Sequence, residues 1–222
     1  MTDPPPTPPA SLSAALDELD LQLPPEQRVQ LDRYRSLLWQ WNEKLNLTRH
    51  TDFRTFASRD VVDSVQLARL LGTGEQVLDV GSGGGVPGMV LAILRPDLDV
   101  CLCESVGKKA KVLDRMVAEL GLPTAVHHGR AESLLEEFGF DVVVGRAIGP
   151  LWKICTWVEP YWHSISRLLL IKGPRWAEER AAARERGVLK GLELRRVAEY
   201  PMSGTSSSSV IVQLTRSRTR SD

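Results

Sequence analysis

The chain has 222 residues, and its 28 Lys+Arg are balanced by 28 Asp+Glu. This balance gives no global electrostatic attraction to nucleic acid, so a nucleic-acid site would have to be a local patch. No apolar run approaches the roughly 18 residues of a membrane span, and the first ten residues lack the basic and apolar regions of a signal peptide. The three cysteines form no CxxC pair, so we expect reduced thiols, no metal and a cytoplasmic protein.

The N-terminal third of the chain is predicted to be helical. Residues 1–10 are proline-rich and are expected to form a disordered tail. Apolar residues at helical spacing predict helices over 11–23, 25–45 and 53–71, the last one ending at Gly72. Residues 11–72 are therefore expected to form a helical cap.

From Gln76 the pattern changes to alternating strands and helices. The predicted strands cover 76–80, 98–103, 124–128, 140–145 and 166–171, and the predicted helices cover 87–94, 107–120, 131–137, 150–158 and 174–187. Such alternation is typical of a parallel sheet with helices on both faces. Two last strands, 192–200 and 210–214, have no helix between them and should pair antiparallel. We therefore expect an α/β domain over 73–215, followed by a short basic tail over 216–222.

The most informative stretch runs from Gln76 to Gly88 and reads QVLDVGSGGGVPG. A buried strand ends there in a glycine-rich turn, and a helix follows. Glycine lets the backbone approach a ligand closely, and a helix start offers free N–H groups. The stretch therefore predicts a cradle for an anionic or nucleotide-like ligand.

Three kinds of nucleotide-binding turn are compatible with a glycine-rich loop between a strand and a helix. No Gly-Lys-Ser/Thr follows it, which excludes a P-loop. Gly83, Gly85 and Gly88 satisfy the dinucleotide pattern G-x-G-x-x-G, but a glycine-dense run satisfies many patterns. Asp79 would repel a pyrophosphate and suits a ligand with an ammonium group. S-adenosylmethionine carries an ammonium and a sulfonium and no phosphate, so it is the favoured ligand.

Further candidate residues follow the next three strands. Glu104 could accept hydrogen bonds from both ribose hydroxyls, although a solvated loop carboxylate is the alternative. The segment Arg130-Ala131-Glu132 could contact an adenine edge, or it could be an ordinary helix start with an acid in its first turn. Arg146 at the end of the fourth strand should point into the same crevice.

These residues carry a family resemblance. DVGSGGGVPG (79–88) resembles the first motif of class I methyltransferases, and more closely that of the RsmG family, also called GidB. The resemblance covers roughly residues 30 to 175 in unbroken order. Its further motifs are NLT (46–48), Asp63-Ser64, E-S-x-x-K-K (104–109), R-A-E (130–132), G-R-A (145–147) and Lys172-Gly173.

The resemblance implies a Rossmann-like, S-adenosylmethionine-dependent fold with a mostly parallel seven-stranded sheet, an antiparallel last strand and an N-terminal helical cap. It also implies methylation of N7 of one guanosine in bacterial 16S ribosomal RNA, with that RNA or the small ribosomal subunit as partner. The cofactor-binding residues that it implies are Asp79, Gly81, Gly83, Val86, Glu104, Ala131, Glu132 and Arg146. Arg146 would also position the reactants, since N7 keeps a lone pair and its methylation needs no general base.

Contacts to RNA are predicted at four basic residues, although scattered solvated side chains are the alternative for each. They are Arg59, Lys108, Lys109 and Lys172. The chain departs from the family pattern at Arg59-Asp60, where the family usually has Arg-His before Asp-Ser. It also has SSSS at 206–209, where an arginine is common in the family.

Three rival functions stay open from the sequence. One is a methyltransferase with a small-molecule or protein substrate, and another is an RNA- or ribosome-binding protein of this fold without catalysis. A nicotinamide-dependent oxidoreductase comes last, because Asp79 disfavours it. A monomer is the default expectation, since no apolar heptads mark an interface.

Overall fold

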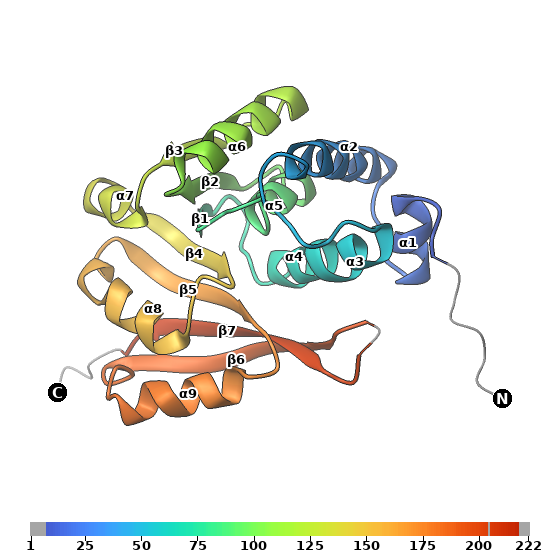
Figure 1. Cartoon of the computed structure of the whole chain (residues 1–222). Helices are drawn as coiled ribbons and strands as arrows, with labels where there is room; N and C mark the ends of the chain where they lie inside the picture. The colour runs from blue at the N-terminus through green and yellow to red at the C-terminus, as the bar shows by residue number, and fades with distance from the viewer. Residues whose placement is uncertain (1–7, 204, 218–222) are drawn as a thin grey trace.

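The computed structural model describes residues 8–203 and 205–217, and these form one seven-stranded sheet (Figure 1). The strand order is β3-β2-β1-β4-β5-β7-β6. The strands are β1 (Gln76–Val80), β2 (Asp99–Glu104), β3 (Ala125–His128), β4 (Phe140–Arg146), β5 (Ile165–Lys172), β6 (Leu192–Pro201) and β7 (Ser208–Arg216). The first five strands are parallel, and β7 is antiparallel to both β5 and β6. The predicted fold class is confirmed.

Helices precede the first strand, and further helices connect strands of the sheet. The N-terminal segment contains α1 (Leu12–Glu18), α2 (Pro25–Asn42), α3 (Phe53–Thr55), a π-helix (Phe56–Val61) and α4 (Val62–Ala68). The helices between and after the strands are α5 (Gly88–Leu94), α6 (Gly107–Leu120), α7 (Ala131–Glu137), α8 (Leu151–Val158), a 3₁₀ turn (Glu159–Tyr161) and α9 (Trp176–Glu185). None of these helices is both long and apolar enough to cross a membrane.

Alternating strand residues build two hydrophobic cores, one on each face of the sheet. Val77 and Leu102 face a core that includes α1, α2, α4, α5 and α6. Leu78 and Val143 face the opposite core, which is closed by α7, α8 and α9. This separation follows from the period of two along a strand. The N-terminal helices therefore share a continuous core with one face of the sheet.

Four helix predictions differ from the structure by two residues or more, and the one for 25–45 ends at Asn42. The first helix ends at Glu18 instead of Leu23, because Asp20 adopts a left-handed backbone (φ 51°) and prolines 24 and 25 begin the next helix. The predicted helix 53–71 is interrupted by a π-helical turn and ends at Ala68. The helix predicted over 174–187 spans only Trp176–Glu185.

The two predicted tails fall mostly outside the described part of the chain. Residues 1–7 and 218–222 lie outside the described residues. Arg216, which was assigned to the basic tail, is the last residue of β7.

The carboxyl ends of the parallel strands meet along one edge of the sheet. Val80 pairs with Cys103 of β2, and Arg146 pairs with Ile171 of β5. The antiparallel hairpin reaches the same edge, because Lys172 of β5 pairs with Val210 of β7. Ligands of doubly wound folds bind at this edge, so the sheet brings the candidate residues together there.

Candidate active site

Two carboxylates hold the glycine-rich turn after β1. Asp79 Oδ2 accepts a hydrogen bond from the Gly88 N–H at 3.0 Å. Glu104 Oε2 accepts from the Gly83 N–H at 2.9 Å, and its Oε1 accepts from the Val106 N–H at 2.7 Å. Both side chains are buried. The loop is therefore fixed by the protein's own acceptors.

At Asp79 the structure differs from the prediction. Its side chain is completely buried beneath the turn and lines neither of the two cavities at the carboxyl edge. The residue shares the side of β1 that packs toward α5, so its carboxylate meets the first residue of that helix instead of the cavity. Its position supports a structural role in the turn.

Burial also sets how Asp79 titrates. Burial raises the pKa of Asp79 from 3.8 to about 7, against the hydrogen bonds from Gly88 and Ser82. The folded protein therefore holds this proton more tightly than the unfolded chain does. The free energy of unfolding that this group contributes is complete below pH 4 and is lost as the pH rises from about 4 to about 7.

We expect the substitution Asp79→Asn to remove the loss of unfolding free energy that Asp79 causes as the pH rises. The free energies of unfolding of the variant and the native protein should converge, or cross, as the pH rises from 4 to 8. The change in their difference should approach about 4 kcal/mol. Urea unfolding across this pH range measures it, with Asp99→Asn, at an exposed position, as control. A difference independent of pH would contradict the assignment.

The smaller cavity has a volume of about 470 Å³ and lies over the ends of β1, β2 and β4. Four predicted cofactor-binding residues line it: Gly81, Ala131, Glu132 and Arg146. Glu104 lies between Cys103 and Ser105, which both line it, while Gly83 and Val86 belong to the adjoining turn.

The residues of the smaller cavity fit S-adenosylmethionine. Glu104 is buried beside the cavity and is not one of its lining residues; each of its oxygens accepts one backbone hydrogen bond and keeps a second acceptor position, which suits two ribose hydroxyls. Ala131 and Glu132 begin α7, where backbone N–H groups have no partner within the helix. Ile148 and Trp157 add apolar wall for a base.

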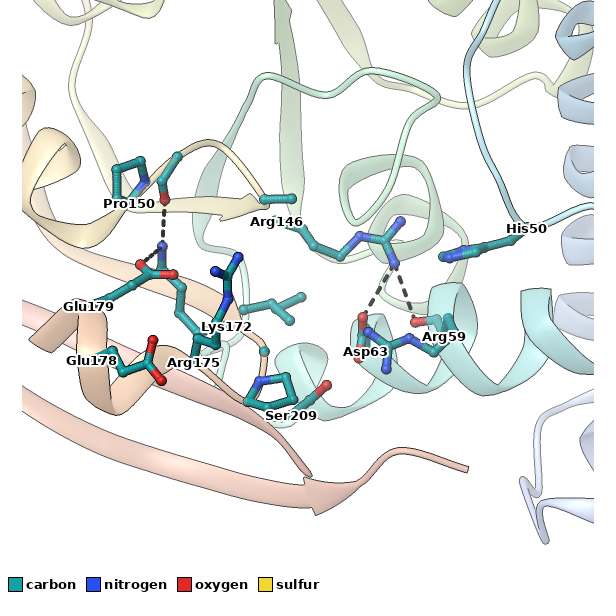
Figure 2. Close-up of a pocket in the computed structure, with 15 residues that line it drawn as sticks. His50, Arg59, Asp63, Arg146, Pro150, Lys172, Arg175, Glu178, Glu179 and Ser209 are labelled. Atoms are coloured by element: carbon teal, nitrogen blue, oxygen red, sulfur yellow. Dashed lines mark hydrogen bonds and ion pairs between the residues drawn. The ribbon is translucent and has the colours of Figure 1, made fainter. Parts of the chain in front are cut away.

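The larger cavity has a volume of about 850 Å³ and lies between the π-helix, α9 and the ends of β4 and β5 (Figure 2). Two predicted RNA contacts, Arg59 and Lys172, line it, whereas Lys108 and Lys109 lie on α6 and line neither cavity. Arg146 and Ala147 line both cavities. The two spaces therefore meet at these residues.

Arg146 is held by a buried cluster of carboxylates. Its Nη2 lies 2.7 Å from Asp60 Oδ1, and its Nη1 lies 3.3 Å from Asp63 Oδ2. Both carboxylates are completely buried, and Tyr200 donates a hydrogen bond to Asp63 Oδ1 at 2.8 Å. Burial raises the pKa of Asp63 although Arg146 opposes the rise. Burial acts to lower the pKa of Arg146, but Asp60 and Asp63 raise it overall, so the guanidinium stays charged and fixed.

Lys172 and Arg59, two other cations of the larger cavity, differ in whether their hydrogen-bond donors already have partners. Lys172 is nearly buried, and its Nζ donates to the Gly149 carbonyl at 2.7 Å and to Glu179 at 2.8 Å (Figure 2). Its charge is thus already balanced within the protein. The Nη1 of Arg59 is buried and has no hydrogen-bond partner among the described residues. Arg59 is therefore the cation with unused donor capacity.

Sequence reasoning missed several residues of this cluster. Asp60 stood out only as a departure from the family pattern, and His50 and Tyr200 were not singled out as site residues. The spacing of Asp60 and Asp63 on a predicted helix was a usable signal, because residues three apart share a face. Tyr200 comes from β6, 137 positions away from Asp63, and no local signal points to it. Within the described residues, no group of three His, Cys, Asp or Glu could hold a metal.

A fold likeness supports the architecture. The solved structure of the 23S rRNA methyltransferase ErmE superposes with a TM-score of 0.52 at 20% identity, covering 72% of this chain and 69% of that chain. At this identity the likeness concerns the fold alone.

Sequence comparisons identify the family. The family model GidB, described as rRNA small subunit methyltransferase G, matches residues 27–204, which extends past the resemblance recognised from the motifs. A protein of Rhodopirellula baltica named ribosomal RNA small subunit methyltransferase G is 54% identical over 89% of this chain and 85% of its own length. A protein of the same name from Pseudomonas paraeruginosa is 38% identical over 78% of this chain and 82% of its own length. The chain therefore belongs to the GidB family of small-subunit rRNA methyltransferases.

Proposed function

We propose that this protein transfers the methyl group of S-adenosylmethionine to N7 of a guanosine in bacterial 16S ribosomal RNA. The observation that carries the proposal is the junction of the two cavities at Arg146 and Ala147. One cavity suits the cofactor, and the other is large enough for a nucleotide. A ribosomal RNA substrate implies action in the cytoplasm.

The residues of the smaller cavity bind and orient the cofactor. Glu104 takes the ribose hydroxyls, and the start of α7 at Ala131 and Glu132 takes the adenine edge. Gly81 allows the chain to pass close to the ligand. When bound, S-adenosylmethionine supplies a methyl group on a sulfonium.

The larger cavity positions the guanine. N7 carries a lone pair at neutral pH, so the protein needs only to hold it in line with the methyl carbon. Proximity and orientation of this kind can supply about 7–11 kcal/mol of a barrier. Arg146 forms the boundary between the two reactants, and Asp60 and Asp63 prevent its guanidinium from moving.

Arg59 supports an RNA substrate over a small molecule. Its buried Nη1 lacks a partner among the described residues, and an unsatisfied guanidinium donor is suited to a phosphate or a base oxygen. Lys108 and Lys109 at the start of α6 would contact more distant phosphates.

Methylation in vitro tests the proposal. Purified protein, S-adenosylmethionine and unmethylated small ribosomal subunits should yield one 7-methylguanosine, mapped by borohydride and aniline cleavage followed by primer extension. Reactions without S-adenosylmethionine, or with NAD in its place, serve as controls. An unchanged cleavage pattern in the complete reaction refutes the ribosomal assignment.

A further inference from the structure

His50 lies in the wall of the larger cavity. Its Nδ1 is 2.8 Å from Asp60 Oδ1, and its side chain is 26% exposed whereas that of Asp60 is completely buried. Figure 2 places its ring opposite the guanidinium of Arg146, close to the π-helix that carries Arg59. A histidine held from behind by a buried carboxylate and open to a cavity in front is arranged to contact a ligand.

The Asp60 carboxylate fixes which nitrogen of His50 carries the proton. The same oxygen, Oδ1, also lies 2.7 Å from Arg146 Nη2, with which it forms an ion pair. A carboxylate paired with a guanidinium can only accept, so the Nδ1–H of His50 must donate to it. In the neutral tautomer that this bond selects, the lone pair is on Nε2. No described residue forms a hydrogen bond with that atom.

The reaction geometry determines which edge of the base faces this wall. N7 must point toward the smaller cavity, where the methyl donor binds. N1–H and the 2-amino group lie on the opposite side of the purine and project into the larger cavity. Both are donors, so they require acceptors, whereas Arg59, Lys172 and Arg175 in that wall are donors.

Besides Asp63, which already accepts from Tyr200 and Arg146, the other side-chain acceptors in the wall of the larger cavity are Glu178, Glu179 and the hydroxyl of Ser209. Glu179 accepts from both Lys172 and the Leu151 N–H through Oε2, and its charge is paired with that of Lys172. Glu178 lies on α9, and Figure 2 draws it on the side of the cavity away from His50. An uncharged acceptor also has an advantage here, because a carboxylate facing RNA would repel nearby phosphates.

We propose that His50 is a recognition residue for the target base, with Nε2 accepting a hydrogen bond from the N1–H or the 2-amino group of guanine. The inference rests on the proposed function, because it assumes a guanosine in the larger cavity. Asp60 acts as the positioning residue that couples this contact to Arg146.

Two substitutions separate the two ring nitrogens. In His50→Asn the amide reaches the position of Nδ1, so it can still donate to Asp60, but nothing replaces Nε2. In His50→Gln the amide reaches the position of Nε2. The control is His163→Asn, since His163 is exposed and bonded only to the Pro160 carbonyl among the described residues.

Steady-state kinetics with unmethylated small subunits give the readout. We expect His50→Asn to raise KM for the subunit roughly tenfold with kcat changed less than about twofold, as for the loss of one hydrogen bond to substrate. His50→Gln should restore most of the loss. Affinity for S-adenosylhomocysteine, measured by calorimetry, should be unchanged in both variants.

Three results would overturn the inference. His50→Asn could leave KM unchanged, or it could lower kcat alone, which would mean that His50 acts only through Arg146. Glu178→Gln could raise KM where His50→Asn does not, which would assign the acceptor to α9. Failure of the native protein to methylate the subunit is separate, because it refutes the proposed function before any variant is compared.

Discussion

Replacing Arg146 by alanine should reduce methyl transfer at least about 100-fold, because Arg146 separates and orients the two reactants. The same change leaves the buried carboxylates of Asp60 and Asp63 without their cation. Breaking a buried ion pair from one side typically costs about 3–5 kcal/mol. Turnover must therefore be expressed per folded molecule, with the folded fraction measured by circular dichroism and urea unfolding.

Two further variants separate catalysis from stability. Arg146→Lys keeps a positive charge but loses the planar fork that bonds both carboxylates, so it should recover stability more fully than turnover. Arg167→Ala is the matched control, because Arg167 is equally shielded (19% against 20% exposed) and is paired with Glu75, which lines neither cavity. It should lose stability and keep its turnover. An Arg146→Ala protein that is folded and turns over normally would contradict the assigned role.

The second large effect is expected at Gly88, the first residue of α5. A Cβ atom on Gly88 would lie 2.2 Å from Leu102 Cδ2 and 2.7 Å from Asp79 Oδ2. Both neighbours belong to buried strands and cannot move aside freely. Gly88→Ala should therefore lower the free energy of unfolding by about 3 kcal/mol, through overpacking and a weakened hydrogen bond to Asp79.

Urea denaturation measures this loss. Gly139→Ala is the control, because its added Cβ would meet only the Ser164 carbonyl at 3.7 Å, an ordinary contact distance. Equal stabilities of the two alanine variants would show that the turn tolerates a side chain at position 88. Affinity for S-adenosylhomocysteine should fall with stability in Gly88→Ala, since the same turn borders the smaller cavity.

The sequence was sufficient to predict the order and type of most elements. Alternating strands and helices after Gln76 fixed a parallel sheet, because hydrophobic periodicity is a local property of the chain. The same alternation predicts that Gly81, Ala131, Glu132 and Arg146 lie at the carboxyl edge of the sheet, since each follows or ends a parallel strand. The motif series identified the family on the same local basis.

The roles of the charged residues depended on the tertiary structure. Asp79 and Glu104 both follow the expected pattern, but only packing determined that Asp79 is buried under α5. The π-helical turn that carries Asp60 has no marker in the sequence, and Tyr200 reaches Asp63 across 137 positions. Such contacts depend on how the N-terminal helices and the β6–β7 hairpin pack around the sheet.

The chain's local patterns therefore determined the fold class, the glycine-rich turn and the family. The tertiary structure alone decided which carboxylates support the turn, which ones hold Arg146, and that His50 lines the larger cavity. The physical reason is that hydrophobic periodicity and turn conformation depend on residues that are close together in the chain. The burial and pairing of charges depend instead on surfaces brought together from distant parts of the chain.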